Sequence, residues 1–69
     1  MEISRNQLLV IQEALDFYIS QTETSLQDLS LIPEERRSEI VSHRLHKLNV
    51  ALSSAKSVKT DIEILLLKN

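Results

Sequence analysis

Two histidines and a glutamate are the residues of this chain whose types and spacing could hold a metal ion. Glu39, His43 and His46 follow one another at intervals of four and three residues, which places one carboxylate and two imidazoles on one face of a helix. That face lies opposite the apolar residues of the same segment, and a Glu and a His four residues apart are also ordinary surface neighbours. We therefore expect a solvated face here, with neither a metal nor a cofactor.

Basic side chains form a short strip on the same segment and could contact phosphate. The strip consists of Arg36, His43, Arg44 and Lys47. Two such strips on a dimer of helical hairpins could bind RNA or DNA, because phosphate contacts supply most of the non-specific affinity. Glu35 and Glu39 interrupt the strip, no aromatic residue accompanies it for base stacking, and the formal net charge is −2. Nucleic-acid binding is therefore the alternative hypothesis, not the favoured one.

Catalysis has little support in this sequence. The chain has no Cys nucleophile and no Gly with which to build a phosphate-binding loop. Nearly all of it has the pattern of straight helices, which leaves no turn-built pocket for a Ser, a His and a carboxylate. We expect a non-enzymatic protein without a small-molecule substrate.

The composition limits the size of the core. The chain has 69 residues, with one Phe, one Tyr, no Trp and no Cys, so its interior must come from aliphatic side chains. A core of fewer than ~70 to 80 residues rarely supplies more than ~3 to 5 kcal/mol, and without disulfides the usual remedy is a second copy. The longest apolar run, residues 64–67, is far shorter than the ~20 residues of a membrane span, and the N-terminal residues lack a secretory pattern. We expect a cytoplasmic protein that self-associates.

The spacing of apolar residues predicts a helix over residues 5–30. Ser4 and Gln7 form a capping box at its start. One face repeats every three or four residues, and we call it the first seam: Leu8, Ile11, Leu15, Ile19, Thr22, Leu26 and Leu29. The polar run at residues 20–25 could instead break the helix, because Ser and Thr compete for backbone hydrogen bonds.

Pro33 marks the connection between two helical segments. Proline is tolerated at the first helical position, so we expect a turn at residues 31–33 and a second helix over 34–68. The apolar face of this helix repeats at alternating spacings of four and three residues, as in coiled coils. We call it the second seam: Val41, Leu45, Leu48, Leu52, Ala55, Lys59, Ile62 and Leu66. Four further residues broaden this face, namely Ile40, Ala51, Val58 and Leu65.

Two helices joined by a short turn predict an all-α antiparallel hairpin, which forms one domain over residues 1–69. Residues 4–31 carry one Arg against four acids, and residues 33–69 carry seven Lys or Arg against five acids. The resulting net charges of −3 and +2 favour docking of the two arms. The thin core predicts that two hairpins assemble as a homodimeric four-helix bundle.

An antiparallel alignment about the predicted turn pairs Leu8 with Val58. It also brings Arg44 level with Thr22 and Glu23. Thr22 and Arg44 would then form a polar layer inside the hairpin, which could fix the register of the helices. In the alternative, Arg44 reaches water along its own methylene groups.

The same alignment leaves the end of the second helix without cover. The predicted helices are about 39 and 52 Å long at ~1.5 Å per residue, so residues 62–67 would extend past the start of the first helix. Apolar residues that point away from the seams gather at this open end and form the predicted partner or oligomer interface: Leu9, Val10, Phe17, Ile64, Leu65 and Leu67. We expect a protein–protein interaction module, acting as a homodimer or as a small regulator or adaptor subunit on a larger protein.

Overall fold

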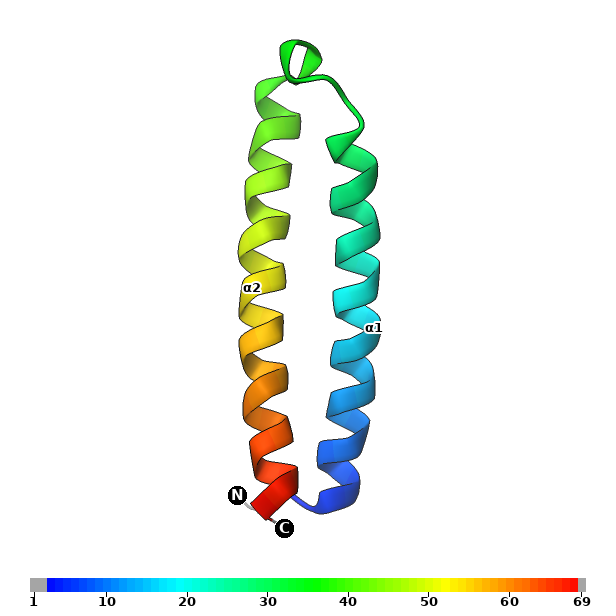
Figure 1. Ribbon diagram of the computed structural model, residues 1–69, viewed down its shortest axis with the longest axis vertical. Coiled ribbons are helices and arrows are strands. Elements are labelled where there is room, and N and C mark those ends of the chain that lie inside the picture. Colours follow the sequence, from blue (N-terminus) through cyan, green and yellow to red (C-terminus); the bar gives the residue numbers. More distant parts are fainter. Residues whose placement is uncertain (1–2, 69) are drawn as a thin grey trace.

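The structure is a long antiparallel hairpin of two α-helices. The computed structural model describes residues 3–68, in which helix α1 spans Arg5–Ser30, a short 3-10 helix η1 spans Glu34–Arg36 and helix α2 spans Glu39–Lys68. The two α-helices lie side by side along a rod of 50 × 16 × 16 Å, with the start of α1 and the end of α2 at the same end (Figure 1). The described residues contain no strand, so the predicted all-α hairpin is confirmed.

Helix α1 has the bounds and the cap that the sequence predicts. The Ser4 hydroxyl accepts a hydrogen bond from the Gln7 N–H at 3.1 Å, and the Ser4 N–H donates to Gln7 Oε1 at 2.8 Å. The helix runs through residues 20–25 without a break. Thr22 faces the core there, and its hydroxyl donates to the Tyr18 carbonyl one turn earlier at 2.8 Å. The hydroxyl is therefore satisfied within the helix and does not compete with it.

The connection between the helices is longer than predicted. Pro33 precedes η1 and does not start α2: its carbonyl accepts a hydrogen bond from the Arg36 N–H at 2.9 Å, which closes a single 3-10 turn. Arg37 then adopts an extended backbone, with φ −76° and ψ 122°, and ends η1. The predicted helix start at residue 34 is wrong, because the proline initiates a short 3-10 turn in place of the long helix.

Helix α2 begins only after Ser38. The Ser38 hydroxyl accepts a hydrogen bond from the Val41 N–H at 3.2 Å, which is the geometry of an N-cap. Glu39 follows in the first turn, where a carboxylate complements the positive end of the helix dipole. The connection thus occupies residues 31–38, and α2 has 30 residues against 26 in α1.

This longer connection changes which residues of the two helices face each other. Val58, which the predicted alignment pairs with Leu8, lies instead beside Leu15 and Tyr18. Each residue of α2 is therefore opposite a later residue of α1 than expected. The predicted alignment is wrong by about two helical turns, because the residues taken for the start of α2 belong to the connection.

The predicted overhang of residues 62–67 is wrong for the same reason. The Arg5 guanidinium donates from Nη1 to the Leu66 carbonyl at 3.2 Å, so the last turn of α2 lies level with the first turn of α1. Figure 1 shows the two helices ending close together at this end of the rod. No long apolar tip extends beyond α1.

The two predicted seams face each other and form the core. Their most deeply buried members are Leu8, Ile19, Thr22, Ala55 and Ile62, and the remaining members are half-buried. The apolar spacing therefore predicted the buried face of each helix correctly, although it did not predict the register between them.

Candidate docking surface

The seams divide the rod into two sides of different chemistry. A residue immediately before a seam residue is rotated by about 100° to one side of the helix, and a residue immediately after it is rotated equally to the other. Because α1 and α2 are antiparallel, the preceding residues of both helices share one side of the rod, which we call the groove face. From α1 the groove face comprises Gln7, Val10, Ala14, Tyr18, Gln21, Ser25 and Asp28. From α2 it comprises Ile40, Arg44, Lys47, Ala51, Ser54, Val58, Asp61 and Leu65.

The residues that follow the seams form the opposite side, which we call the polar face. From α1 it comprises Leu9, Gln12, Asp16, Ser20, Glu23, Gln27 and Ser30. From α2 it comprises Ser42, His46, Asn49, Ser53, Lys56, Thr60, Glu63 and Leu67. Only its two leucines are large and apolar, so the two sides of the rod have clearly different chemistry.

A shallow groove runs between the helices on the groove face. It is lined by Leu15, Tyr18, Ala51, Ser54, Ala55 and Val58, and its lining is mostly apolar. Tyr18 and Val58 are 47% and 46% exposed, so large side chains border a stretch of small ones. The groove is nearly flat and open to solvent. Such a surface suits the face of another helix, whereas a small molecule needs a more enclosed pocket.

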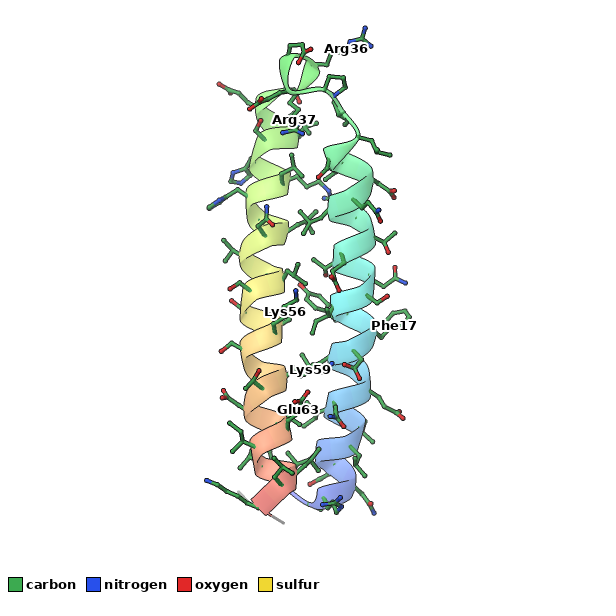
Figure 2. All side chains as sticks on the ribbon, in the orientation of Figure 1. Phe17, Arg36, Arg37, Lys56, Lys59 and Glu63 are labelled. Atoms are coloured by element: carbon green, nitrogen blue, oxygen red, sulfur yellow. The ribbon has the colours of Figure 1, made fainter. Side chains whose placement is uncertain are left out.

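The ion pair between the two helices lies on the side of the polar face. The Lys59 ammonium, from the second seam, pairs with the Asp16 carboxylate, and this hydrogen bond raises the pKa of Lys59 above its usual 10.5. Lys56, Lys59 and Glu63 follow one another along α2 beside α1 (Figure 2). A second shallow depression on this side is lined by Arg5, Gln12, Glu63, Leu66 and Leu67. These charges and amides are solvated and do not form an apolar docking surface.

The six predicted interface residues are all exposed, but they do not form one surface. Val10 and Leu65 lie on the groove face, whereas Leu9 and Leu67 lie on the polar face. Phe17 points outward from α1, away from α2 (Figure 2). A single flat partner can therefore contact only some of them at once.

Ile64, the sixth of these residues, lies two positions before the seam residue Leu66, on the outer side of α2. Exposed apolar residues are also not confined to the open end of the rod. Leu31 and Ile40, at the turn end, are 79% and 80% exposed. Exposed apolar residues therefore occur at both ends of the rod, because the late start of α2 leaves Ile40 in its first turn with no facing residue in α1.

The predicted polar layer is not formed inside the hairpin. Thr22 is buried at 5% exposure, but Arg44 is exposed. The longer connection moves Arg44 toward the turn and away from Thr22, and its place immediately before the seam residue Leu45 turns it onto the groove face. Arg44 therefore reaches water, as in the second of the two alternatives.

The residues of the predicted basic strip are all exposed but do not share one surface. Arg44 and Lys47 lie on the groove face, while His43 lies on the outer side of α2. Arg36 projects from η1 at the tip of the rod (Figure 2).

The three candidate metal ligands, Glu39, His43 and His46, are all exposed. Residues 3–68 contain no group of three or more His, Cys, Asp or Glu side chains that could hold a metal ion.

Sequence reasoning missed Tyr18 and the two residues that shape the connection. Tyr18 borders the groove, and its spacing of four residues from Ala14 and from Thr22 could have placed it next to the seam. Ser38, followed by an acidic residue, has the signature of a helix N-cap. Arg37 had no signal in the sequence, because its role depends on how the chain folds back.

In comparisons with models of protein families, with curated proteins and with solved structures, nothing matches this chain. Among residues 3–68, neither helix combines the length and the apolar character that crossing a membrane requires. The functional argument therefore rests on the faces of the rod.

Proposed function

We propose that this chain is a non-catalytic protein–protein interaction module that presents its groove face to another helical surface, with a homodimeric four-helix bundle as its basic unit. The supporting observation is the balance between exposed and buried apolar side chains. Within residues 3–68, twelve large apolar side chains are exposed, whereas the buried apolar core consists of Leu8, Ile19, Ala55 and Ile62. Burial of apolar surface is the main driving force of folding and association, so a chain with this balance is stabilised by a partner.

The dimensions of the hairpin support the same proposal. A rod 16 Å thick lets each helix cover only one face of the other. A core in so short a chain rarely supplies more than ~3 to 5 kcal/mol. A second hairpin stacked on the groove face would give every helix a second neighbour, which is the packing of a four-helix bundle. The groove would then become part of an enlarged core.

The chemistry of the groove also favours docking over catalysis. Apart from the hydroxyls of Tyr18 and Ser54, its lining is apolar. Hydroxyls without a neighbouring base or metal are poor nucleophiles. The proposed role needs no cofactor and no small-molecule substrate, and the same face would serve if the chain were a regulator or adaptor subunit on a larger protein.

The molar mass of the purified chain across a range of concentrations tests this proposal. We expect the mass to rise from 7.9 kDa toward twice that value as the concentration increases, with little change on adding salt, because apolar contacts are not screened. Sedimentation equilibrium measures both the mass and the dissociation constant. A well-folded chain that remains at 7.9 kDa up to millimolar concentration would contradict the proposal.

Nucleic-acid binding is the second candidate function, and the exposure of Arg36, His43, Arg44 and Lys47 is the observation in its favour. Affinity for an RNA or DNA duplex would then fall steeply with salt concentration, because neutralising phosphates releases counterions. The net charge of −2 and the separation of these residues on different sides of the rod favour the interaction module. Binding that is absent at low salt would exclude this candidate.

A further inference from the structure

We propose that the groove face is covered by a second copy of the chain turned end for end, so that the two α2 helices pack antiparallel and Arg44 of each copy pairs with the partner's Asp61. This inference rests on the proposed function, because it names the face and the orientation of the dimer. Its basis is the residue pattern of the groove face along α2.

That pattern is a second, complete heptad stripe. Eight residues follow one another at alternating spacings of four and three along all of α2, and each immediately precedes a residue of the second seam. The stripe is therefore rotated by about 100° from the seam. A helix in a four-helix bundle needs two packing faces at about this angle, one for each neighbour. In the isolated hairpin only one of the two faces of α2 is covered.

Two copies of the stripe are complementary when they run in opposite directions. Its two central residues, Ala51 and Ser54, are small, so two α2 helices can approach closely there. A twofold axis between them places Arg44 opposite the partner's Asp61, and Ile40 opposite the partner's Leu65. Ile40 and Leu65 are 80% and 44% exposed, and this contact covers both. A parallel arrangement would instead place like charges opposite each other, which disfavours it.

The remaining layer of the stripe fits the same arrangement. Lys47 falls opposite the partner's Val58, where its methylene groups can cover the valine while its ammonium stays in water. The rod is 50 Å long and 16 Å wide, so covering one face hides on the order of 800 Å² per copy. Stable protein–protein interfaces bury about 800 Å² per partner, so one face of the hairpin is large enough.

A charge-reversal cycle tests the proposed pair. Arg44→Asp and Asp61→Arg each place like charges opposite each other twice in the symmetric dimer, and we expect each to weaken dimerisation on the order of tenfold. The double variant should recover the wild-type dissociation constant to within about threefold. The two residues are about 26 Å apart along one helix at ~1.5 Å per residue, so a direct contact within one copy cannot account for this recovery. A double variant as weak as the single variants would overturn the inference.

Lys56→Asp is the matched control, because Lys56 is an exposed cation of α2 that lies on the polar face. We expect its dissociation constant to remain within about twofold of the wild-type value, since the proposed dimer leaves the polar face in solvent. Circular dichroism of all variants confirms that the helices are intact. A loss of dimer affinity as large as that of Arg44→Asp would show that net charge, and not the proposed contact, controls association.

The orientation of the two copies has its own measurement. The chain has no Cys, so Glu35→Cys, at an exposed position in η1, accepts a single spin label. In the end-for-end dimer the two labels lie at opposite ends of the bundle, separated by about its 50 Å length. A dimer with a label separation near the bundle's width would overturn this inference while leaving the proposed function intact, whereas the absence of any dimer would overturn both.

Discussion

At the residue scale, Leu8 and Leu9 are neighbours in the sequence with opposite environments. Leu8 is 2% exposed between the helices, whereas Leu9 is 40% exposed on the polar face. Removing a buried leucine side chain costs about 2 to 5 kcal/mol, which is comparable to the whole stability of so small a core. The position of each side chain relative to the seam therefore decides its contribution to stability.

We accordingly predict that Leu8→Ala largely unfolds the chain at room temperature, while Leu9→Ala lowers its stability by less than about 1 kcal/mol. Thermal unfolding followed by circular dichroism measures both, and each variant is the other's control. Equal losses of stability in the two variants would show that Leu9 is also covered, and hence that the polar face takes part in an interface.

The pair of Lys59 with Asp16 gives the stability of the hairpin a dependence on alkaline pH. Because the hydrogen bond to Asp16 raises the pKa of Lys59 above 10.5, the folded state holds this proton more tightly than the unfolded state does. The pair's contribution is thus complete below pH 10.5 and is lost as the pH rises through the raised pKa. Lys59→Met keeps the methylene groups in the seam and removes only the charge.

We predict that the melting temperatures of the wild-type chain and Lys59→Met differ at neutral pH and converge above the raised pKa of Lys59. All other residues are identical in the two chains, so the difference between the two curves reports on Lys59 alone. Melting curves recorded at several pH values measure this difference. A difference that stays constant across the alkaline range would show that the charge of Lys59 does not stabilise the fold.

At the scale of the elements, the sequence predicted the helices better than their connection. Helix α1 was predictable to the residue, because a capping box and a regular apolar spacing are local features. The second seam was predictable for the same reason. The connection was not, because Pro33 suits the start of a 3-10 turn as well as the start of an α-helix, and only the later N-cap at Ser38 decides between them.

The connection depends on one arginine of an adjacent pair. Arg37 is half-buried, and its Nε donates to the Ile32 carbonyl at 3.0 Å and its Nη2 to the Ser30 carbonyl at 3.5 Å. The Ser30 carbonyl belongs to the last residue of α1, where a cation also complements the helix dipole, and the Ile32 carbonyl follows it in the connection. Arg36 is exposed and projects from the tip of the rod (Figure 2).

We therefore predict that Arg37→Ala lowers the free energy of unfolding by about 1 kcal/mol, whereas Arg36→Ala changes it by no more than about 0.5 kcal/mol. Urea unfolding of the two variants measures the difference at equal net charge. The reverse order, with Arg36→Ala more damaging, would mean that the backbone contacts of Arg37 do not stabilise the connection.

At the scale of the whole molecule, the faces of the rod were only partly predictable. The sequence showed that Ile40, Ala51, Val58 and Leu65 lie beside the second seam, and these residues form the apolar part of the groove face on α2. The seams and the antiparallel topology together also indicate which residues of α1 share that side, but the prediction grouped Leu9 and Leu67 with Val10 and Leu65 because all of them lie near the open end, and not by side. The sequence could not show which residues of the two helices lie level with each other, because this register depends on the length of the connection.

Two valines of α2 provide a test of which face is covered in the assembled protein. Val58 lies on the groove face and Val50 on the outer side of the same helix, and their exposed fractions in the hairpin are 46% and 52%. In an isolated hairpin, Val58→Lys and Val50→Lys should therefore cost similar amounts of stability. If the groove face is covered by a second copy, only Val58→Lys places a cation inside the interface, opposite the partner's Lys47.

For the wild-type chain and for Val50→Lys, we predict that the melting temperature rises by roughly 5 to 10 °C over a hundredfold increase in concentration, because association stabilises the folded state by mass action. For Val58→Lys, we predict a lower melting temperature that does not change with concentration. Differential scanning calorimetry at two concentrations measures both effects. Loss of the concentration dependence in Val50→Lys instead would place the interface on the outer side of α2, where Ile64 is also exposed.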